Sequence, residues 1–484
     1  MHYKIIGRIL SQILALEAVF MLPSVLLGFY DGNIQAAQSF LLSMGVILAI
    51  AGVLFLLCRK SDRKLYAREG MVCVGLSWIL MSLLGCLPFW ISREIPRFID
   101  AFFEIVSGFT TTGASVVPDV EKLSRAVLYW RSFSHWLGGM GVLVFLLAIA
   151  PSAGAEGGFT LHLLRAESPG PNVGKLVPRM KQTAKILYLL YLLLTVLDII
   201  FLLLGGMPVF EAICTAMGTT GTGGFGVKSD SLAGYSPYIQ YVTTVFMFLS
   251  GVNFSVYHLL LLRQLRSAFR NEELWLYCGL IAGSTALIVW NLHGMYATFG
   301  ETLRHALFQV VCIVTSTGFT TVDFNLWPVF SKAILLCLMV IGACAGSTGG
   351  GFKCARALLV FKCLRRNVRQ VVHPQKVQTV RVDGQLVDEK ILSNTAMYLI
   401  AYVVIILCSF LVVSLDGFSL TTGFSAVITC MNNIGPGLDS VGPASNFASL
   451  SVLSKLVLIA DMLIGRLEIY PILVLFSRST WANR

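Results

Sequence analysis

The chain has 484 residues, of which 56% are hydrophobic and only 13% are charged. Soluble globular proteins carry about 25% charged residues, so this composition, with a mean hydropathy of +0.78, excludes that class and indicates an integral membrane protein. The 12 cysteines and 7 histidines show no paired or metal-ligand spacing, and no serine stands in a triad-like setting. These patterns argue against a metal site, a disulfide framework and an enzyme.

Stretches long enough to cross a membrane occur along the whole chain. A hydrocarbon core needs about 20 apolar residues per helix. The first stretch, near 5–30, is too long for a cleaved signal peptide and has no small-residue cleavage site after it, so we expect it to be retained. Ten such stretches lie near 5–30, 37–58, 71–92, 128–150, 183–206, 238–262, 275–297, 330–364, 392–415 and 449–477. Ten spans place both termini on one side of the membrane.

The basic residues indicate which side that is. Lys and Arg concentrate in cytoplasmic loops, and most of the 36 Lys and Arg residues fall at the termini and in the even-numbered connections. We therefore expect both termini in the cytoplasm. The net charge of +11 follows from this topology, so no nucleic-acid partner is needed to explain it.

A recurring pattern occupies four of the outer connections. An apolar stretch of about half the spanning length ends each time in polar residues and glycine, which suits a re-entrant half-helix. The copies follow the third, fifth, seventh and ninth spans and read AFFEIVSGFTTTGASV (101–116), EAICTAMGTTGTGGFG (211–226), ALFQVVCIVTSTGFTT (306–321) and GFSAVITCMNNIGPGL (423–438).

One glycine in each copy is taken as equivalent: Gly113, Gly223, Gly318 and Gly435, with Gly224 as the alternative in the second copy. Irregular backbone at membrane depth is tolerated only where it is buried in protein or lines a water-filled cavity. Four such loops on one axis can replace the hydration shell of a cation with carbonyl oxygens, and glycine permits the φ > 0 that this requires. Ordinary Gly/Thr-rich turns are the alternative, but four copies at matching positions favour a pore.

These loops, the two extra N-terminal spans and the strings GACAGSTGGGFKCARALLVFK (342–362) and MLIGRLEIY (462–470) resemble the TrkH family of bacterial potassium uptake proteins, within the Trk, Ktr and HKT superfamily. The resemblance covers essentially the whole chain. It implies an all-α membrane protein of about ten transmembrane helices, with four pseudo-repeated units of helix, pore loop and helix around one central pore. It also implies a homodimer in the bacterial cytoplasmic membrane, regulated by a cytosolic ring of TrkA-like nucleotide-binding subunits.

The resemblance implies potassium as the transported ion, with no other cofactor, and a division into five parts. These are an N-terminal two-helix extension (1–65), pore repeat 1 (66–155), pore repeat 2 (175–270), pore repeat 3 with a broken inner helix (271–370) and pore repeat 4 (385–484). By motif position, the filter residues are Thr110, Thr111, Thr112, Gly113, Thr220, Gly221, Thr222, Gly223, Thr315, Ser316, Thr317, Gly318, Asn432, Asn433, Ile434 and Gly435. Because the four segments differ, we expect imperfect selectivity, with some passage of sodium or rubidium.

A glycine-rich stretch interrupts the eighth span. Each glycine costs roughly 1 kcal/mol relative to alanine inside a helix, so the helix is expected to break there. The phosphate-loop motif GxxxxGK[ST] is absent. A gate below the filter, formed by Gly346, Ser347, Thr348, Gly349, Gly350 and Gly351, is the favoured hypothesis, as in the resembled family; a passive kink is the alternative.

Arg466 lies within the last span, where an arginine costs about 2.5 to 3.5 kcal/mol on insertion scales and is usually functional. A fixed positive charge near a cation pathway raises the barrier to permeation, and the resembled family places an arginine of this motif in the pore. The alternatives are an ion pair with Glu468 or Asp461, or snorkelling toward the inner surface. We expect Arg466 to form a constriction together with the glycine-rich stretch.

Other polar residues in the spans are expected to hold the structure together. Glu104 and Gln309 occupy the same place before Gly113 and Gly318 and are predicted to hold the pore half-helices by hydrogen bonding. Arg131 and His135 are predicted to anchor the fourth span rather than to transport ions.

The longest cytoplasmic connection, 353–390, is strongly basic and contains QTVRVDGQLV, which alternates around an Asp-Gly turn as a small hairpin does. We expect a hairpin below the pore to dock the soluble regulator. Contact with anionic lipid is the alternative.

Two alternatives concern the transport mechanism. A secondary transporter with inverted repeats predicts two related halves, which four parallel loop copies do not support. A sodium- or proton-coupled potassium symporter on the same scaffold stays open, because coupling leaves no clear motif.

Overall fold

The computed structural model describes residues 2–59, 66–141 and 180–481. Within them almost all regular structure is helical, and the strands are β1 (Arg381–Val382) and β2 (Gln385–Leu386). In this part of the chain, six helical runs are long and apolar enough to cross a membrane, and a seventh is counted if the bent pair of α12 and α13 forms one span. The expected class of all-α membrane protein is confirmed.

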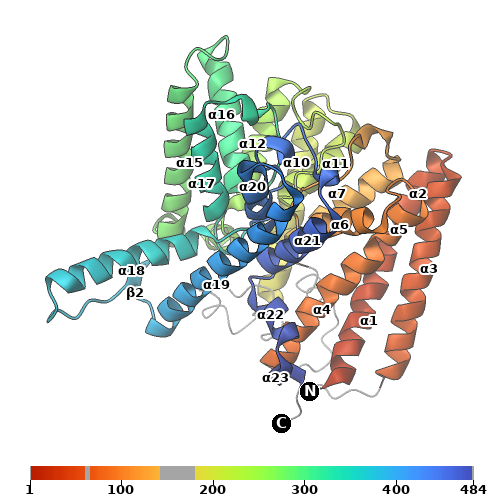
Figure 1. The fold of residues 1–484 in the computed structure, drawn as a ribbon, viewed down its shortest axis with the longest axis horizontal. Helices are drawn as coiled ribbons and strands as arrows, with labels where there is room; N and C mark the ends of the chain where they lie inside the picture. Colours follow the sequence, from red (N-terminus) through yellow and green to blue (C-terminus); the bar gives the residue numbers. More distant parts are fainter. Residues whose placement is uncertain (1, 60–65, 142–179, 482–484) are drawn as a thin grey trace.

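Three helices form the N-terminal extension: α1 (Tyr3–Phe20), α2 (Leu22–Tyr30) and α3 (Ile34–Leu57). They lie at one edge of the molecule (Figure 1), where α1 contacts α3 and α4, and α2 contacts α7. The apolar content of α1 and α2 forms one run, Tyr3–Tyr30, of spanning length. This extension therefore covers the outside of the first repeat.

The rest of the chain shows the same order four times: an outer helix, a short pore helix and an inner helix. The outer helices are α4 (Ala67–Gly85, continued by α5, Leu87–Ile91), α10 (Met180–Leu204), α15 (Glu272–Asn291) and α19 (Glu389–Val413). The pore helices are α6 (Phe98–Phe109), α11 (Val209–Thr220), α16 (Phe299–Val314) and α20 (Leu420–Met431). The inner helices are α7 (Arg125–Gly139), α12 (Pro237–Gly251), α17 (Val329–Ile341) and α21 (Val452–Arg466).

The remaining elements lie between or after these helices. They are α13 (Phe254–Leu261), α14 (Leu265–Phe269), α18 (Cys354–Val372), α22 (Tyr470–Phe476), α23 (Arg478–Trp481) and the 3-10 turns Val120–Lys122, Phe324–Leu326, Ser414–Asp416, Asp439–Val441 and Phe447–Ser449. The domain boundaries expected at residues 65, 155 and 175 fall outside the described residues.

The inner helices begin with the residues that favour a helix start. Ser124, Ser236 and Ser451 are the N-caps of α7, α12 and α21, and each side-chain oxygen accepts a hydrogen bond from a backbone N–H of the first turn. Such caps satisfy N–H groups that have no partner within the helix. The same start therefore recurs in three repeats.

All four inner helices are 13 to 15 residues long, shorter than the about 20 residues needed to cross a membrane, whereas the sequence indicated a break only in the third repeat. The helix α7 ends at Gly139, and α12 ends at Gly251, after which the chain bends by 88° into α13. After α21, Glu468 and Ile469 have φ of 57° and 69°, which no helix accommodates. Continuous helices over 238–262 and 449–477 were therefore wrong predictions; the span over 128–150 runs into residues outside the described part.

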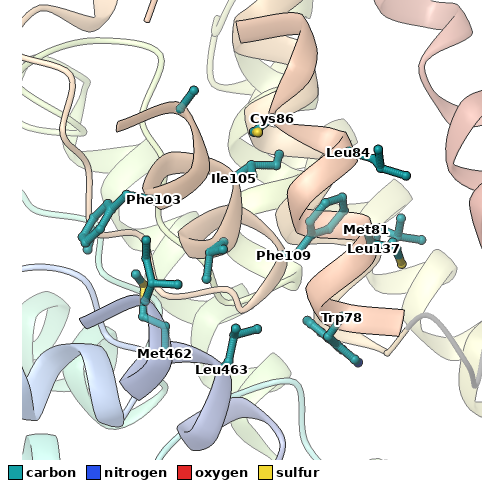
Figure 2. Packing of buried hydrophobic residues seen from close by; sticks show 14 of the residues in the cluster. Trp78, Met81, Leu84, Cys86, Phe103, Ile105, Phe109, Leu137, Met462 and Leu463 are labelled. Carbon is teal, nitrogen blue, oxygen red and sulfur yellow. The ribbon is translucent and has the colours of Figure 1, made fainter. Parts of the chain in front are cut away.

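The repeats close into a ring. Each inner helix packs against the pore helix of the next repeat: α7 on α11, α12 on α16, α17 on α20, and α21 on α6. Figure 2 shows the last of these contacts, in which Phe103, Ile105 and Phe109 of α6 share one buried cluster with Trp78 of α4 and with Met462 and Leu463 of α21. The core therefore surrounds the pore helices and holds them in place.

The outer connections close the same ring by hydrogen bonds. Their donor and acceptor pairs, in ring order, are Ser229 N to Glu121 Oε1 (3.2 Å), Leu232 N to Thr320 O (3.0 Å), Asp439 N to Asn325 Oδ1 (2.9 Å) and Phe447 N to Ser115 O (2.9 Å). Each bond joins one repeat to the next, and the fourth returns to the first.

The helix α18 projects away from the bundle, and after its far end the chain turns back (Figure 1). The hairpin therefore lies alongside α18, where Nζ of Lys362 donates to Arg381 O at 2.6 Å. The strands β1 and β2 pair in antiparallel fashion around Asp383 and Gly384, whose φ values are 51° and 77°. Two positive φ angles in a two-residue hairpin loop are typical of a type I′ turn. The hairpin predicted from the sequence is confirmed. Both chain termini lie at the same end of the molecule (Figure 1).

Candidate ion pathway

Four pore helices end where the repeats meet. Their C-caps are Thr110, Gly221, Thr315 and Asn432. The C-terminal end of a helix carries a partial negative charge, which favours a cation. Four such ends on one axis make the region below them attractive to a positive ion.

The chain makes the same turn after each pore helix. One backbone hydrogen bond reaches back five residues in every copy: Thr112 N to Ser107 O (2.8 Å), Gly223 N to Gly218 O (2.8 Å), Thr317 N to Cys312 O (2.9 Å) and Ile434 N to Thr429 O (2.9 Å). The residue before each donor has left-handed φ: Thr111 (55°), Thr222 (54°), Ser316 (54°) and Asn433 (54°). The residue after each donor is a glycine with positive φ: Gly113 (80°), Gly224 (76°), Gly318 (92°) and Gly435 (101°).

This geometry corrects the alignment of the second copy. Gly224, and not Gly223, is the counterpart of Gly113, so the matching segment is 221–224 and Thr220 lies outside it as the last residue of α11. We call the segments wall 1 (110–113), wall 2 (221–224), wall 3 (315–318) and wall 4 (432–435). Gly223 is a glycine for another reason, since a Cβ there would lie closer than 3.0 Å to the ring of His135.

The four wall glycines form a closed ring with carbonyl oxygens. A Cβ on any of them would lie closer than 3.0 Å to a carbonyl oxygen of the adjacent wall. The pairs are Gly113 with Gly223 O, Gly224 with Thr317 O, Gly318 with Ile434 O, and Gly435 with Thr112 O. Only glycine fits here, for both space and φ. The contacts bring four backbone oxygens, one from each wall, around a common axis.

Walls 1 and 3 have similar side chains, whereas walls 2 and 4 differ from them and from each other. In walls 1 and 3, the first and third residues share a hydroxyl hydrogen bond, Thr110 to Thr112 at 2.8 Å and Thr315 to Thr317 at 2.7 Å. Wall 2 has glycine at both of these positions.

Wall 4 differs from the other three. The amide of Asn432 bonds the Tyr402 hydroxyl, and Nδ2 of Asn433 donates to Oγ1 of Thr112 at 3.0 Å. Its third residue is Ile434, which has no hydroxyl. Because the ring runs in the order 1, 2, 3, 4, the two threonine walls face one another.

A buried polar cluster lies behind wall 1. Glu104 pairs with Arg131 at 2.7 Å and accepts a hydrogen bond from Val116 N at 2.9 Å. The Nδ1 of His135 lies 2.8 Å from Gly108 O, and its Nε2 accepts from Phe225 N at 3.3 Å. These contacts place Arg131 and His135 behind the pore helices, where they fix loop geometry.

Gln309 does not make hydrogen bonds of the kind that Glu104 makes. Both amide atoms of Gln309 are buried, and neither has a hydrogen-bond partner among the described residues. The expected hydrogen-bonding role is therefore absent from this part of the structure for Gln309, although the sequence places it at the same position as Glu104.

The segment 342–353, which we call the glycine loop, separates α17 from α18 as the sequence indicated. Gly342, Gly346 and Gly351 have positive φ, and Lys353 has a φ of 77°. The N–H of Gly350 donates to Oγ of Ser316 at 2.6 Å. The glycine loop therefore touches the underside of wall 3 directly.

Arg466 bridges the glycine loop and the first repeat. Its guanidinium donates to Thr348 O at 2.8 Å, to Gly138 O at 2.5 Å and to Gly139 O at 2.8 Å. The two glycine carbonyls end α7, so the positive charge sits at a helix C-terminus. Of the acids considered as partners, Glu468 pairs with Arg356, and Asp461 accepts from Ser409 at 2.7 Å.

Sequence reasoning missed two basic residues of this region. Lys353 is buried and donates to Gly349 O, and Arg356 is buried against Glu468 and lies 4.1 Å from the Tyr398 ring centroid. The sequence did contain a signal for them, because Lys353 and Arg356 closely follow the glycine run and lie inside the span expected at 330–364. Across the described residues, no group of three or more His, Cys, Asp or Glu could hold a metal ion, so the polar groups that converge here are mainly backbone carbonyls and hydroxyls.

Comparisons with known proteins point to one family. The sequence matches the family model of TrkH, described as "Cation transport protein", over residues 36–273 and 292–482. It is 38% identical to the Trk system potassium uptake protein TrkH of Salmonella typhimurium, over 99% of this chain and 100% of that protein. It is 33% identical to TrkG of Escherichia coli, over 100% and 99% respectively. The crystal structure of the potassium transporter TrkH from Vibrio parahaemolyticus matches with a TM-score of 0.88 at 32% identity, over 100% of both chains.

Proposed function

Because this chain belongs to the TrkH family of cation transport proteins, which are not enzymes, we propose that it takes up potassium through the axis of its four walls. The observation that carries the proposal is the closed ring in which each wall glycine meets a carbonyl oxygen of the next wall. Backbone carbonyls that surround an axis replace the water shell of a potassium ion. The relatives named as potassium uptake proteins cover the whole chain at similar length.

The proposed filter consists of walls 1 to 4. Its residues are those predicted from the sequence, with wall 2 moved by one position to Gly221, Thr222, Gly223 and Gly224. The backbone supports approximate fourfold symmetry, whereas the side chains match only between the opposite walls 1 and 3. We infer that potassium is preferred by the backbone cage and that rubidium and some sodium also pass, because the walls differ.

The proposed gate is the glycine loop together with Arg466. The loop lies beneath walls 3 and 4, where a Cβ on Gly349 or Gly350 would lie closer than 3.0 Å to Thr315 O or Asn432 O respectively. Arg466 adds a fixed positive charge, bound to Thr348 O, on the same side of the filter. A cation that leaves the filter inward meets both.

Regulation is proposed to enter through the hairpin. Asp383 at its turn accepts a hydrogen bond from Glu272 N at 2.9 Å, and Lys362 of α18 pairs with the Glu272 carboxylate. The next residue, Glu273, accepts from Ala345 N of the glycine loop at 2.5 Å. One turn of α15 thus contacts both the hairpin and the gate. A partner that moves the hairpin has a short mechanical route to the loop.

The cellular setting follows from the sequence resemblance and the topology. We infer a homodimer in the bacterial cytoplasmic membrane with a TrkA-like nucleotide-binding ring on the cytoplasmic side. Both termini, which share one end of the molecule (Figure 1), are assigned to that side by the distribution of basic residues.

A coupled mode is the second candidate. Glu17 is 1% exposed, and neither carboxylate oxygen has a hydrogen-bond partner among the described residues. It lies beside Gly85, where a Cβ would be 2.7 Å from its Oε1 and 2.9 Å from the ring of Phe109. A buried carboxyl next to the first pore helix is a candidate proton carrier, which favours proton coupling over sodium coupling.

The experiment is flux into proteoliposomes that contain the purified full chain, with opposed potassium, rubidium and sodium gradients. We expect potassium and rubidium uptake well above sodium uptake, driven by the ion gradient alone. Deleting Ala345 to Gly349 is expected to raise potassium flux about tenfold or more, because the loop no longer reaches walls 3 and 4.

Two results argue against these assignments. Flux that requires a pH gradient would favour the coupled candidate. Unchanged flux after the deletion would remove the gate assignment while leaving the filter.

A further inference from the structure

The second residue of each wall occupies one equivalent position. Thr111, Thr222, Ser316 and Asn433 are all fully buried and share the same left-handed φ. Three of the four carry a hydroxyl at the same place in the turn. The structure therefore offers four versions of one position, and their surroundings can be compared directly.

The hydroxyls have different partners. Oγ of Ser316 accepts the N–H of Gly350 at 2.6 Å, which joins wall 3 to the glycine loop. Oγ1 of Thr222 donates to Gly221 O within its own wall at 2.7 Å. Oγ1 of Thr111 has no hydrogen-bond partner among the described residues. Of the three described hydroxyls, the Ser316 hydroxyl is the one that reaches the loop.

The N–H of Gly350 lies in a confined place. Gly350 is buried, and a Cβ on it would be 2.7 Å from Asn432 O and 2.8 Å from the Cβ of Asn433 in wall 4. Ser316 of wall 3 faces its N–H. A buried backbone N–H needs an acceptor, and one left without a partner costs about 1 to 3 kcal/mol. Ser316 supplies that acceptor only while the loop lies against the filter.

We propose that Ser316 is a latch that holds the glycine loop against wall 3 and so sets how often the pore is closed. The inference rests on the proposed gating role of the loop and adds a positioning residue on the filter side. It assigns the latch to a single wall, although all four walls share the same turn. Movement of the loop away from the axis must break the bond between Gly350 and Ser316.

The test is a double-mutant cycle measured as resting potassium flux in proteoliposomes without any cytosolic partner. Ser316→Ala is made in the intact chain and in the chain lacking Ala345 to Gly349. In the intact chain we expect it to raise the fraction of open pores about tenfold, because the closed state loses the acceptor for Gly350, and to change permeation as well. In the deletion background the same substitution acts on permeation only, so its effect on flux in the intact chain divided by its effect in the deletion background is about ten.

Thr111→Ala is the matched comparison. It removes a hydroxyl from the equivalent position of wall 1, which the loop does not reach by a hydrogen bond. Both substitutions lie in the filter, so both are expected to change the flux itself. For Thr111→Ala the change is expected to be the same in both backgrounds, which gives a ratio of about one.

Two further variants keep the result interpretable. Ser316→Gly also removes the hydroxyl but suits the positive φ, so it is expected to fold and to show the same ratio as Ser316→Ala. Ser316→Thr keeps the acceptor, and walls 1 and 2 already hold threonine at this φ. It is expected to return the ratio to about one.

The outcomes separate the latch from the gate. Suppose that deleting Ala345 to Gly349 raises flux, but Ser316→Ala and Ser316→Gly each have the same effect on flux in both backgrounds. This result would overturn the latch and leave the proposed gate standing. Equal ratios for Ser316→Ala and Thr111→Ala would also overturn it. If the deletion has no effect on flux in the chain with Ser316 intact, the proposed gate fails and the latch fails with it.

Discussion

The proposed filter, which consists of walls 1 to 4, and the glycine loop lie next to each other and are built differently. Every repeat contributes the same turn to the walls, with the same hydrogen bond and the same positive φ. The glycine loop comes from the third repeat only and lies against walls 3 and 4, while Arg466 ties it to the first repeat. Four equal backbones can surround an ion evenly, but an element supplied once can move without dismantling the ring.

The largest effect on potassium flux is expected from a substitution in the ring of wall glycines, to which all four repeats contribute. Gly113→Ala places a Cβ against Gly223 O at a φ of 80°. We expect potassium flux to fall to about 1% of wild type or less, because the carbonyl ring is displaced. Proteoliposome flux is the measurement. Gly279→Ala, in α15 with nothing within 4 Å of the added Cβ, is the control and should keep wild-type flux. Retained flux in Gly113→Ala would argue against the ring as the filter.

A substitution that releases the glycine loop, which only the third repeat supplies, is expected to raise potassium flux instead of lowering it. Arg466→Ala removes three hydrogen bonds from a charged group to backbone carbonyls and also removes a positive charge from the pathway. Hydrogen bonds of this kind contribute about 1.5 to 3 kcal/mol each, so an increase in resting flux of about tenfold is expected. Arg478→Ala, beyond the last long helix, is the control. A silent Arg466 variant would return this residue to a structural role.

The route from the hairpin to the gate gives a smaller effect. Substituting Arg365, Arg366 and Arg369 together with alanine is expected to weaken the binding of a cytosolic nucleotide-binding ring about tenfold or more, because surface charge steers and orients such contacts. Pull-down and light scattering with the purified ring measure it. Resting flux without the ring should stay near the wild-type value. Equal ring binding by both proteins would move the docking site elsewhere.

The smallest effect should come from the side chains of the walls. Ile434→Thr gives wall 4 the third residue of walls 1 and 3. We expect the ratio of potassium to sodium flux to rise about twofold to fivefold, because hydroxyls then surround the axis more evenly. The measurement is competition between the two ions under one gradient. Ile434→Val, which keeps an apolar side chain of similar shape, is the comparison and should leave the ratio unchanged.

Local sequence was sufficient for much of the fold and the site. The half-length stretches before Gly113, Gly318 and Gly435 and the Asp-Gly turn of the hairpin are found where they were expected, and six of the apolar runs form helices of spanning length. These are short-range features, set by hydropathy, by helix length and by the φ that glycine allows. The break after Ile341 also follows from local composition, since five glycines in a short stretch cannot continue a helix.

Contacts between repeats decided the rest. The position of Gly224 depends on Thr317 O of the next wall, and Gly223 is a glycine because of the His135 ring; two adjacent glycines look the same in the sequence. No run of glycines lies at the breaks after Gly251 and Arg466, so local composition did not predict these breaks. The bond of Gly350 to Ser316 joins residues whose side-by-side placement only the packed ring produces. The sequence alone therefore determined which segments turn, because that depends on neighbouring residues. The tertiary structure decided which polar groups meet, because that depends on residues far apart in the chain, 34 positions for Ser316 and Gly350 and 321 for Thr112 and Asn433.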